Sequence, residues 1–185
     1  MPHPYHLLLA LPFAQSVAQA GPSRQLSSLE ETRSCTEASA TTFSLKGVFY
    51  VRVETSPYAI TAFPNSTQLA FEVINNANGV STGCSLQNVQ HDNVWPDLSN
   101  YWFKCLDRSY EVDGSEYPIN TSTNFLWDDS WKLRVNQTWN CDGQTIVKQV
   151  ATATLKPTCK ETSSPQQYIE NCDISDAEVP ATDQQ

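Results

Sequence analysis

The chain has 185 residues, with 11 basic and 20 acidic side chains and a formal net charge of −9. This acidic balance argues against nucleic acid or an anionic membrane as a partner, because binding to either requires basic side chains that face the phosphates. Beyond residue 20, the remaining length suits one domain with its own hydrophobic core.

Residues 1–20 are expected to form a signal peptide that is removed on secretion. The apolar run from Leu7 to Phe13 is too short to span a bilayer, and Ala18-Gln19-Ala20 has the small-x-small pattern of a cleavage site. We therefore expect a secreted, extracellular protein. Residues 21–34 are polar without strand periodicity, so they are interpreted as a flexible leader before an ordered domain over residues 35–172.

The first predicted strands lie between residues 43 and 74. Alternation predicts a long strand over residues 43–53, where Gly47 falls on the apolar side and indicates a bulge or a bend. Its apolar side is expected to carry Phe43, Leu45, Phe49, Val51 and Val53. An exposed loop with a glycosylation sequon at Asn65 follows, and residues 68–74 then predict a second strand.

The middle of the chain is interpreted mainly as turns and loops. The asparagine-rich run 75–79 predicts a tight turn, and the polar segment after Cys84 predicts a loop that contains His91. Residues 101–105 form a short aromatic strand in this interpretation. Residues 106–122 are acidic and loop-like, with a second sequon at Asn120. A further short strand is expected over residues 124–127, followed by a turn at residues 128–130.

Residues 131–159 show the clearest pattern in the chain, that of a β-hairpin. The first arm should turn Leu133, Val135, Trp139 and Cys141 to one apolar face, which only Gln137 interrupts. Asp142-Gly143 suits a type I′ turn. The return arm aligns Val147, Ala151, Ala153 and Leu155. The third sequon, at Asn136, has the opposite parity, so a glycan there would project into solvent.

The alternation of strands with turns predicts an all-β fold, a single compact antiparallel β-barrel or sandwich stabilised by disulfides. No segment shows a sustained helical period, and residues 29–32 are the only weak helical candidate. Residues 173–185 are acidic and polar, and we expect them to form a disordered tail.

All six cysteines lie beyond the expected cleavage site, which indicates three disulfides in an oxidising compartment. Six cysteines can pair in fifteen ways, so the connectivity stays open. Proximity along the chain favours Cys84 with Cys105 and Cys159 with Cys172, which leaves Cys35 for Cys141. Zinc is the competing interpretation, but there is no CxxC spacing and only one histidine follows residue 20.

The search for catalytic residues yields weak candidates only. His91 is the sole imidazole after residue 20, and an ordinary exposed loop histidine is the far more common case. Asp128 and Asp129 are adjacent, so on a strand they would point to opposite faces, and a turn is the more common role for such a pair. A small calcium site there would lack EF-hand spacing. The sequence predicts no enzyme, no cofactor and no metal.

Aromatic side chains in the loops are the candidate binding surface. Trp95, Trp102 and Tyr110 are the residues that we expect there, whereas Trp139 has the parity of a core residue. For any single tryptophan, core packing is about three times as common as a ligand site.

Short motifs of the chain resemble those of the family of the Alternaria major allergen and its elicitor relatives, which are small secreted fungal proteins. The motifs are Asn78-Gly79-Val80-Ser81-Thr82-Gly83-Cys84, Tyr101-Trp102-Phe103-Lys104-Cys105, Val135-Asn136-Gln137-Thr138-Trp139-Asn140-Cys141 and Val150-Ala151-Thr152-Ala153-Thr154-Leu155, with Cys159 and Cys172 after them. The resemblance implies an antiparallel β-barrel with bonds Cys84–Cys105 and Cys159–Cys172. It also implies a non-catalytic protein that binds host defence proteins or small phenolic ligands. It further implies a homodimer linked through an early cysteine, whereas here Cys35 also has Cys141 as a candidate partner within the chain.

Two hypotheses follow from the sequence. The first is a secreted, glycosylated effector, elicitor or allergen-like protein that binds host (plant) extracellular proteins or small ligands. The alternative is a secreted carbohydrate-binding module or lectin-like protein, which the tryptophans and the acidic charge favour.

Overall fold

The computed structural model describes residues 42–60, 63–112, 114–140 and 145–183. The chain divides into two compact units, residues 1–31 and residues 32–185, and every described residue belongs to the second. All the regular elements in these ranges are β-strands. No helix among the described residues has the length and apolar character needed to cross a membrane. The expected signal peptide, leader, helical candidate and early cysteine Cys35 lie outside the described residues.

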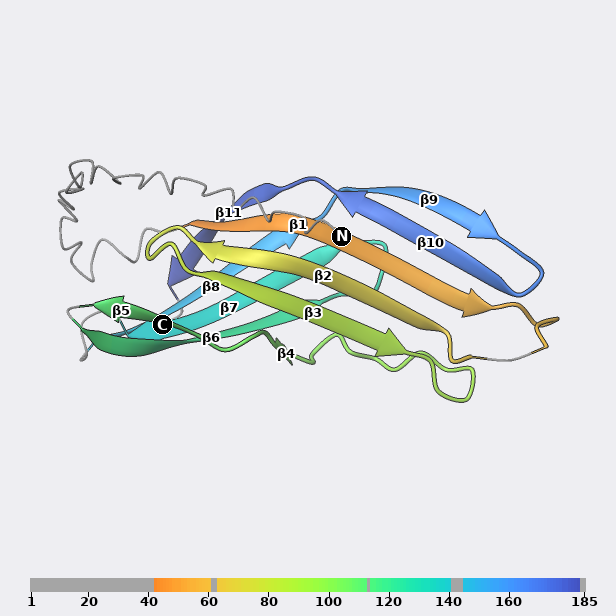
Figure 1. Cartoon of the computed structure of the whole chain (residues 1–185), viewed down its shortest axis with the longest axis horizontal. Coiled ribbons are helices and arrows are strands. Elements are labelled where there is room, and N and C mark those ends of the chain that lie inside the picture. Colours follow the sequence, from red (N-terminus) through yellow and green to blue (C-terminus); the bar gives the residue numbers. More distant parts are fainter. Residues whose placement is uncertain (1–41, 61–62, 113, 141–144, 184–185) are drawn as a thin grey trace, which may run out of the picture. The chain divides into compact units, whose positions relative to one another are not determined.

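Eleven strands form one sheet, and every pairing in it is antiparallel. Hydrogen-bonded neighbours follow the order β3-β2-β1-β11-β8-β7-β6-β4, with β10 also on β1, β9 on β10 and β5 on β6 (Figure 1). The strands are β1 Thr42–Thr55, β2 Ser66–Asn75, β3 Ser81–Val89, β4 Phe103–Lys104, β5 Arg108–Val112, β6 Ser115–Phe125, β7 Lys132–Asn140, β8 Ile146–Thr154, β9 Pro157–Ser163, β10 Gln167–Ile174 and β11 Ala177–Asp183.

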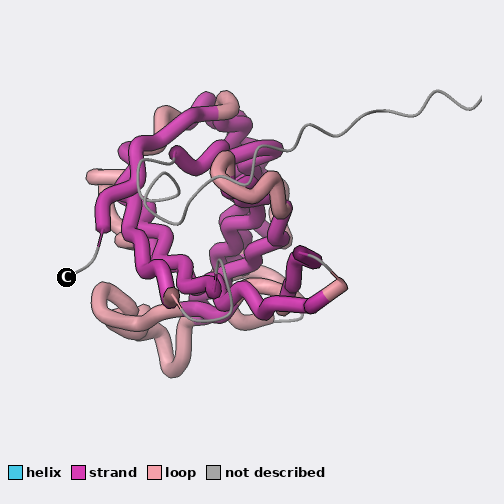
Figure 2. Tube along the Cα trace, turned by 90° about the vertical axis from the view of Figure 1, so that its left-hand side faces the viewer, coloured by secondary structure: helices cyan, strands magenta, loops and turns pink. Residues whose placement is uncertain are grey.

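The sheet curls until β3 and β4, the two ends of this strand order, approach each other. It is therefore a nearly closed barrel, as predicted (Figure 2). The segment around Cys105 forms the seam. Its amide N–H donates to the Thr121 carbonyl on β6 at 2.9 Å, while the next amide, of Leu106, donates to the Gly83 carbonyl on β3 at 2.9 Å. The Cys84–Cys105 disulfide joins the same two sides. The barrel is therefore closed by a few hydrogen bonds and one disulfide on the two sides of this short segment.

A β-bulge in β1 reverses the alternation that we predicted for it. Gly47 has a φ of 56°, and the register with β2 shifts between Lys46 and Phe49. The extra residue moves every later side chain to the other face. Phe49 is consequently 43% exposed, whereas Tyr50 is 8% exposed and points inward. The inward orientation predicted for Phe49, Val51 and Val53 is wrong, and Arg52 has the inward parity instead.

The barrel interior contains two apolar clusters. The smaller one consists of Ile119, Trp139 and Val147, with Ala77 and Val80 packed against it. The larger cluster fills much of the remaining interior and includes Phe43, Leu45, Leu69, Phe71, Val73, Leu86, Phe125, Leu133, Val135, Leu155 and Val179. The polar side chains of Asn75, Thr121 and Gln137 are also fully or nearly fully buried, so the interior has a hydrogen-bonded polar layer as well.

The hairpin of β7 and β8 confirms the clearest sequence pattern. Leu133, Val135 and Trp139 are buried on one arm, and Val147, Ala151, Ala153 and Leu155 are buried on the other. The ladder between the two arms extends as far as the pair Asn140 and Ile146. The predicted Asp142-Gly143 turn itself lies outside the described residues.

Two segments predicted to lack regular structure form strands. The acidic stretch 106–122 contains β5 and most of β6, whose inward side chains include Thr121 and Thr123. Polar residues on the inner face hid the alternation that identifies a strand. The tail expected to be disordered contains the end of β10 and all of β11, which pairs with both β1 and β8 and buries Val179. The expectation of a disordered tail is therefore wrong for residues 173–183.

Candidate ligand-binding cavity

A row of polar side chains crosses the inner face of three strands at one end of the barrel. The register places Arg52 of β1 opposite Thr67 of β2, and Thr67 opposite Asn88 of β3. Thr67 is 7% exposed and Asn88 is 3% exposed. The neighbouring inward residues, Tyr50 and Leu69, belong to the large apolar cluster. The apolar lining of the barrel thus gives way to hydrogen-bonding groups at this row.

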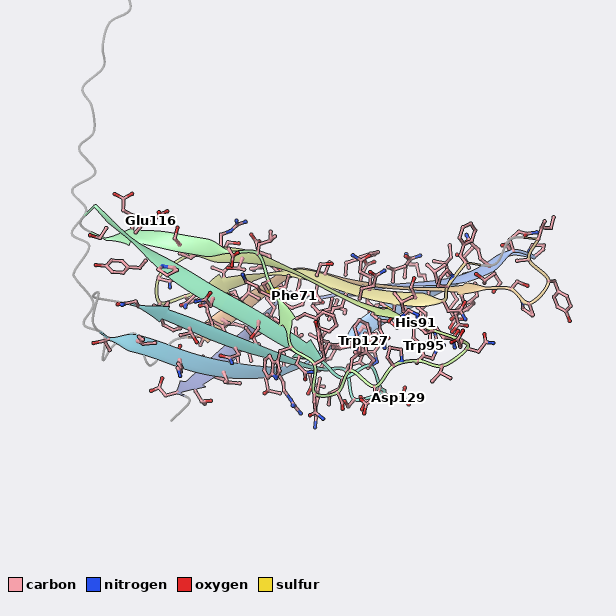
Figure 3. All side chains as sticks on the ribbon, turned by 90° about the horizontal axis from the view of Figure 1, so that it is seen from below. Phe71, His91, Trp95, Glu116, Trp127 and Asp129 are labelled. Carbon is pink, nitrogen blue, oxygen red and sulfur yellow. A yellow bond between two sulfur atoms is a disulfide. The ribbon has the colours of Figure 1, made fainter. Side chains whose placement is uncertain are left out.

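Two connecting segments cover this row and leave a cavity of about 360 Å³. Residues 95–99 contribute from the β3–β4 connection, and residues 126–128 contribute from the β6–β7 connection. The cavity is also lined by Tyr50, Arg52, Thr67 and Asn88. Figure 3 shows the labelled Trp95 and Trp127 close together here, with Glu116 at the opposite end of the strands.

Asn124 holds the first of these segments in place. Its Nδ2 group donates to the carbonyl oxygens of Leu98 at 3.3 Å, Ser99 at 3.0 Å and Tyr101 at 2.8 Å. Asp97 adds a local turn, since its Oδ1 accepts the Ser99 amide at 2.9 Å. Asn124 is fully buried, so these bonds are shielded from water. One β6 side chain therefore positions a wall of the cavity.

Asn124→Asp is expected to loosen that wall. The carboxylate has no proton to donate and would face three carbonyl oxygens, so we expect a loss of about 2–4 kcal/mol in the free energy of unfolding. Hydrogen exchange should also accelerate at residues 98–101. The matched control is Asn93→Asp, an exposed residue in the same connection. Equal stability of the two variants in urea unfolding would show that Asn124 does not have this role.

Aromatic rings pack beneath and beside the cavity. Trp131, in the left-handed region at a φ of 51°, contacts Tyr50 edge-on with ring centroids 4.9 Å apart. Phe125 packs against both Trp131 at 5.8 Å and Trp127 at 5.0 Å. The predicted turn at residues 128–130 is present, since Asp128 Oδ1 accepts hydrogen bonds from the Ser130 amide and hydroxyl. These contacts fix the orientation of the Trp127 indole.

The charges at the cavity are predominantly negative. Arg52 is paired with Glu54, so its positive charge is already compensated. Burial opposes the charge on Arg52, but the hydrogen bond and the charge of Glu54 outweigh it and raise the pKa of Arg52. Hydrogen bonds from Ser99 lower the pKa of Asp97, and those from Ser130 lower the pKa of Asp128. Both carboxyl groups are therefore ionised at neutral pH.

Burial, followed by the negative charge of Glu170, raises the pKa of Tyr50 from 10.0 to about 12. Folded Tyr50 thus keeps its proton at a pH where the unfolded chain has lost it. Its contribution to stability is complete below pH 10 and is lost as the pH rises towards about 12. We expect Tyr50→Phe to flatten the fall in stability across that window, as measured by urea unfolding at several pH values. An unchanged pH profile would contradict this assignment.

Three residues that line the cavity each have a buried polar atom without a hydrogen-bond partner among the described residues: Thr67 Oγ1, Asn88 Oδ1 and Trp127 Nε1. An unsatisfied buried donor or acceptor costs about 1–3 kcal/mol. The set contains an acceptor, a donor and a hydroxyl that can act as either. Each of these atoms has less than 1 Å² of accessible surface, so they lie behind the surface of the cavity.

The residues predicted as a binding surface are not all brought together. Trp95 lines the cavity, whereas Trp102 is 38% exposed and is not part of the lining. Tyr110 lies in β5, opposite Tyr117. Sequence reasoning missed Trp127, Thr67 and Asn88. Their inward parity on β2 and β3 was the available signal for the latter two, but nothing in the sequence showed that these strands lie beneath the Trp95 loop.

The other sequence-predicted site residues occupy the periphery. His91 is exposed in a turn, where its amide donates to the Val94 carbonyl at 2.9 Å. Asn120 and Asn136 lie on the outer face of β6 and β7, diagonally across the ladder. Asn65 is engaged on both sides, since Oδ1 accepts the Thr55 amide at 2.7 Å and Nδ2 donates to Gln90 Oε1 at 2.7 Å. All three remain predicted glycosylation sites.

The two disulfides favoured by proximity, Cys84–Cys105 and Cys159–Cys172, are present. Cys35 and Cys141 lie outside the described residues. The described part of the chain contains one group with the spacing of a metal site, Cys159, Glu170 and Cys172. Both sulfur atoms there are joined to each other, so they provide no thiolate ligands.

No model of a known protein family matches the chain, and no curated protein does. Two crystal structures of the allergen Alt a 1 of Alternaria alternata resemble it, each at 20% sequence identity over 77% of this chain. One of these structures is covered over 88% of its length with a TM-score of 0.42, and the other, a structure of the major allergen Alt a 1, is covered over 94% with a TM-score of 0.44. The resemblance that the sequence motifs indicated is thus found among solved structures as well, at a moderate level.

Proposed function

We propose that this protein acts outside the cell by binding rather than by catalysis, and that it takes a small ligand in the cavity beneath Trp95 and Trp127. The cavity of about 360 Å³, lined by two tryptophans and by polar side chains from β1, β2 and β3, carries this proposal. The two disulfides support an oxidising, extracellular location. The biological role that we propose is that of a fungal effector, elicitor or allergen-like protein, with host extracellular proteins or small ligands as partners.

The positions of the titratable candidates support binding over catalysis. A nucleophilic or acid–base site requires reacting groups within hydrogen-bond distance of each other. His91 is exposed in its own turn, and Asp128 is engaged by Ser130 within a turn. The cavity, in contrast, combines indole rings with a few polar side chains, as small-molecule binding sites commonly do.

Ligand-detected NMR on the purified full chain tests the proposal. The probe mixture should contain phenols and neutral oligosaccharides, and we expect saturation transfer to at least one member. Trp127→Ala should abolish that signal, whereas Trp102→Ala, the same change at an exposed indole outside the lining, should preserve it. Transfer to no member of the mixture would overturn the proposed ligand site.

The non-catalytic part needs a separate assay. We expect no turnover when the protein is incubated with a panel of polysaccharide and ester substrates. Turnover that disappears in His91→Ala or Asp128→Asn would show that the protein is an enzyme, and the proposal would then be wrong.

A further inference from the structure

The strand β9 is a free edge of the sheet. Among the described strands it pairs with β10 alone, whereas β10 also pairs with β1 on its other side (Figure 1). Every residue of β9 after Pro157 is exposed, and Pro157 itself is half-buried. An exposed edge of this length offers unpaired amide and carbonyl groups to another chain. β9 is therefore a candidate surface for strand addition.

The pairing of β9 with β10 shows which backbone groups point to this edge. Cys159 faces Cys172, and their Cα atoms are 4.0 Å apart. This short separation is typical of a pair that does not exchange backbone hydrogen bonds, so the amide and carbonyl of Cys159 point away from β10. The other parity points towards β10, as the Ser164 amide does when it donates to the Gln167 carbonyl at 2.8 Å. The residues that present both backbone groups to an added strand are thus Cys159, Glu161 and Ser163.

A second copy of β9 is a poor occupant of this edge. When two β9 strands pair antiparallel over their full length, Lys160 of one copy faces Lys160 of the other. The register centred on the next residue places Glu161 opposite Glu161. Like charges directly opposite each other destabilise a strand pair. The edge therefore disfavours self-association and favours a strand of different sequence.

The side chains next to the edge favour a basic strand. The register places Glu161 of β9 opposite Glu170 of β10, and Glu170 opposite Arg52 of β1. Arg52 is already paired with Glu54, so the inner face of these three strands has an excess of negative charge. An added strand would place a side chain beside Glu161 on this face, where lysine or arginine is stabilising. The net charge of −9 also favours the approach of a basic partner.

We propose that β9 binds an extended, basic segment of a partner protein, which adds to the sheet as an antiparallel strand. Its alternate lysine or arginine side chains face Glu161 and Glu170. The inference rests on the proposed function, because it specifies how this protein binds extracellular protein partners. It assigns those partners to a surface other than the ligand cavity, so the two can be tested separately.

Fluorescence anisotropy of labelled heptapeptides with the purified full chain tests the inference at low ionic strength. The basic probe is Thr-Lys-Val-Lys-Val-Lys-Thr, and the control probe Thr-Glu-Val-Glu-Val-Glu-Thr has the opposite charge. We expect the basic probe to bind at least about tenfold more tightly than the control. N-methylation of its lysine amides, which face β9 in the proposed strand, should abolish binding, whereas N-methylation of its valine amides should preserve it. Equal affinity of the two N-methylated probes would overturn strand addition.

Two charge-reversal variants locate the binding of the basic probe. Glu161→Lys should weaken it at least about tenfold. Glu116→Lys makes the same change in net charge at an exposed position of β6, towards the opposite end of the molecule from β9 in Figure 1, and should leave the affinity unchanged. Equal losses in the two variants would indicate general charge attraction and overturn the inference.

The outcome for the edge is separable from the outcome for the cavity. If the basic probe does not bind while the NMR screen is positive, the inference about β9 is wrong and the proposed ligand cavity stands. If neither the peptide nor any member of the NMR mixture binds, both are wrong.

Discussion

Replacing Cys84 and Cys105 together by alanine is expected to lower the free energy of unfolding by at least about 3 kcal/mol. The bond closes a loop with a sequence separation of 21 residues, and chain entropy alone accounts for about that amount. The structure adds a second effect, because this bond lies at the seam where β3 meets the segment after β4. The hydrogen bonds that the Leu106 amide and the Arg108 side chain donate to β3 join the two sides together with this disulfide.

The double variant Cys159→Ala/Cys172→Ala is the matched control. Its separation of 13 residues gives nearly the same chain-entropy term, about 3 kcal/mol. Cys159 and Cys172 face each other on β9 and β10, which hold together through their own ladder. Urea unfolding should therefore show a larger loss for the seam variant, and hydrogen exchange should accelerate in β3 for that variant only. Equal losses with unchanged exchange in β3 would contradict the role of the seam.

Gln137→Leu is expected to destabilise the protein by about 3–5 kcal/mol, even though it adds an apolar side chain to the interior. Gln137 is fully buried, its Oε1 accepts from Asn75 Nδ2 at 2.5 Å, and its Nε2 donates to Thr121 Oγ1 at 2.8 Å. Leucine would remove both bonds and leave two buried groups without these partners, at about 1–3 kcal/mol each. The substitution keeps the Asn136 sequon, so glycosylation does not confound the urea or thermal unfolding measurement.

The double variant Gln137→Leu/Thr121→Val tests this explanation. Valine removes the Thr121 hydroxyl with little change in shape, so the second substitution should cost less in the Gln137→Leu background than in the wild type. Strict additivity of the two losses would show that the two side chains do not interact as described. The Asn120 sequon also survives, since its third residue is Ser122.

The sequence predicted best where one face of a strand is apolar. The β7–β8 hairpin and the strand around Leu69, Phe71 and Val73 follow that rule, and their buried residues are the predicted ones. The sequence-based prediction failed where the inner face of a strand is polar, as at Thr121 in β6. Both faces then carry polar residues, so apolar and polar residues do not alternate along the strand. The prediction also failed for the part of β1 after Gly47. The face on which those residues lie depends on the register shift between β1 and β2, and a glycine in the sequence does not reveal that shift.

The candidate cavity was only partly predictable for a related reason. Trp95 was selected as a loop aromatic, and it does line the cavity. Thr67 and Asn88 are unremarkable in sequence, since buried threonines and asparagines are recognised only by their surroundings. Trp127 was assigned to a strand end, and its contact with the cavity depends on the turn that follows.

By itself, the sequence determined the strand-rich class and the hairpin, and it favoured the two short-range disulfides, because these depend on residues close together in the chain. Tertiary structure alone decided which strands close the ring, on which face β1 carries Arg52 after its bulge, and which loop covers the end of the barrel. The physical reason is that the cavity is assembled from residues 50–52, 67, 88, 95–99 and 126–128. Their proximity arises from long-range strand pairing, which no local pattern encodes.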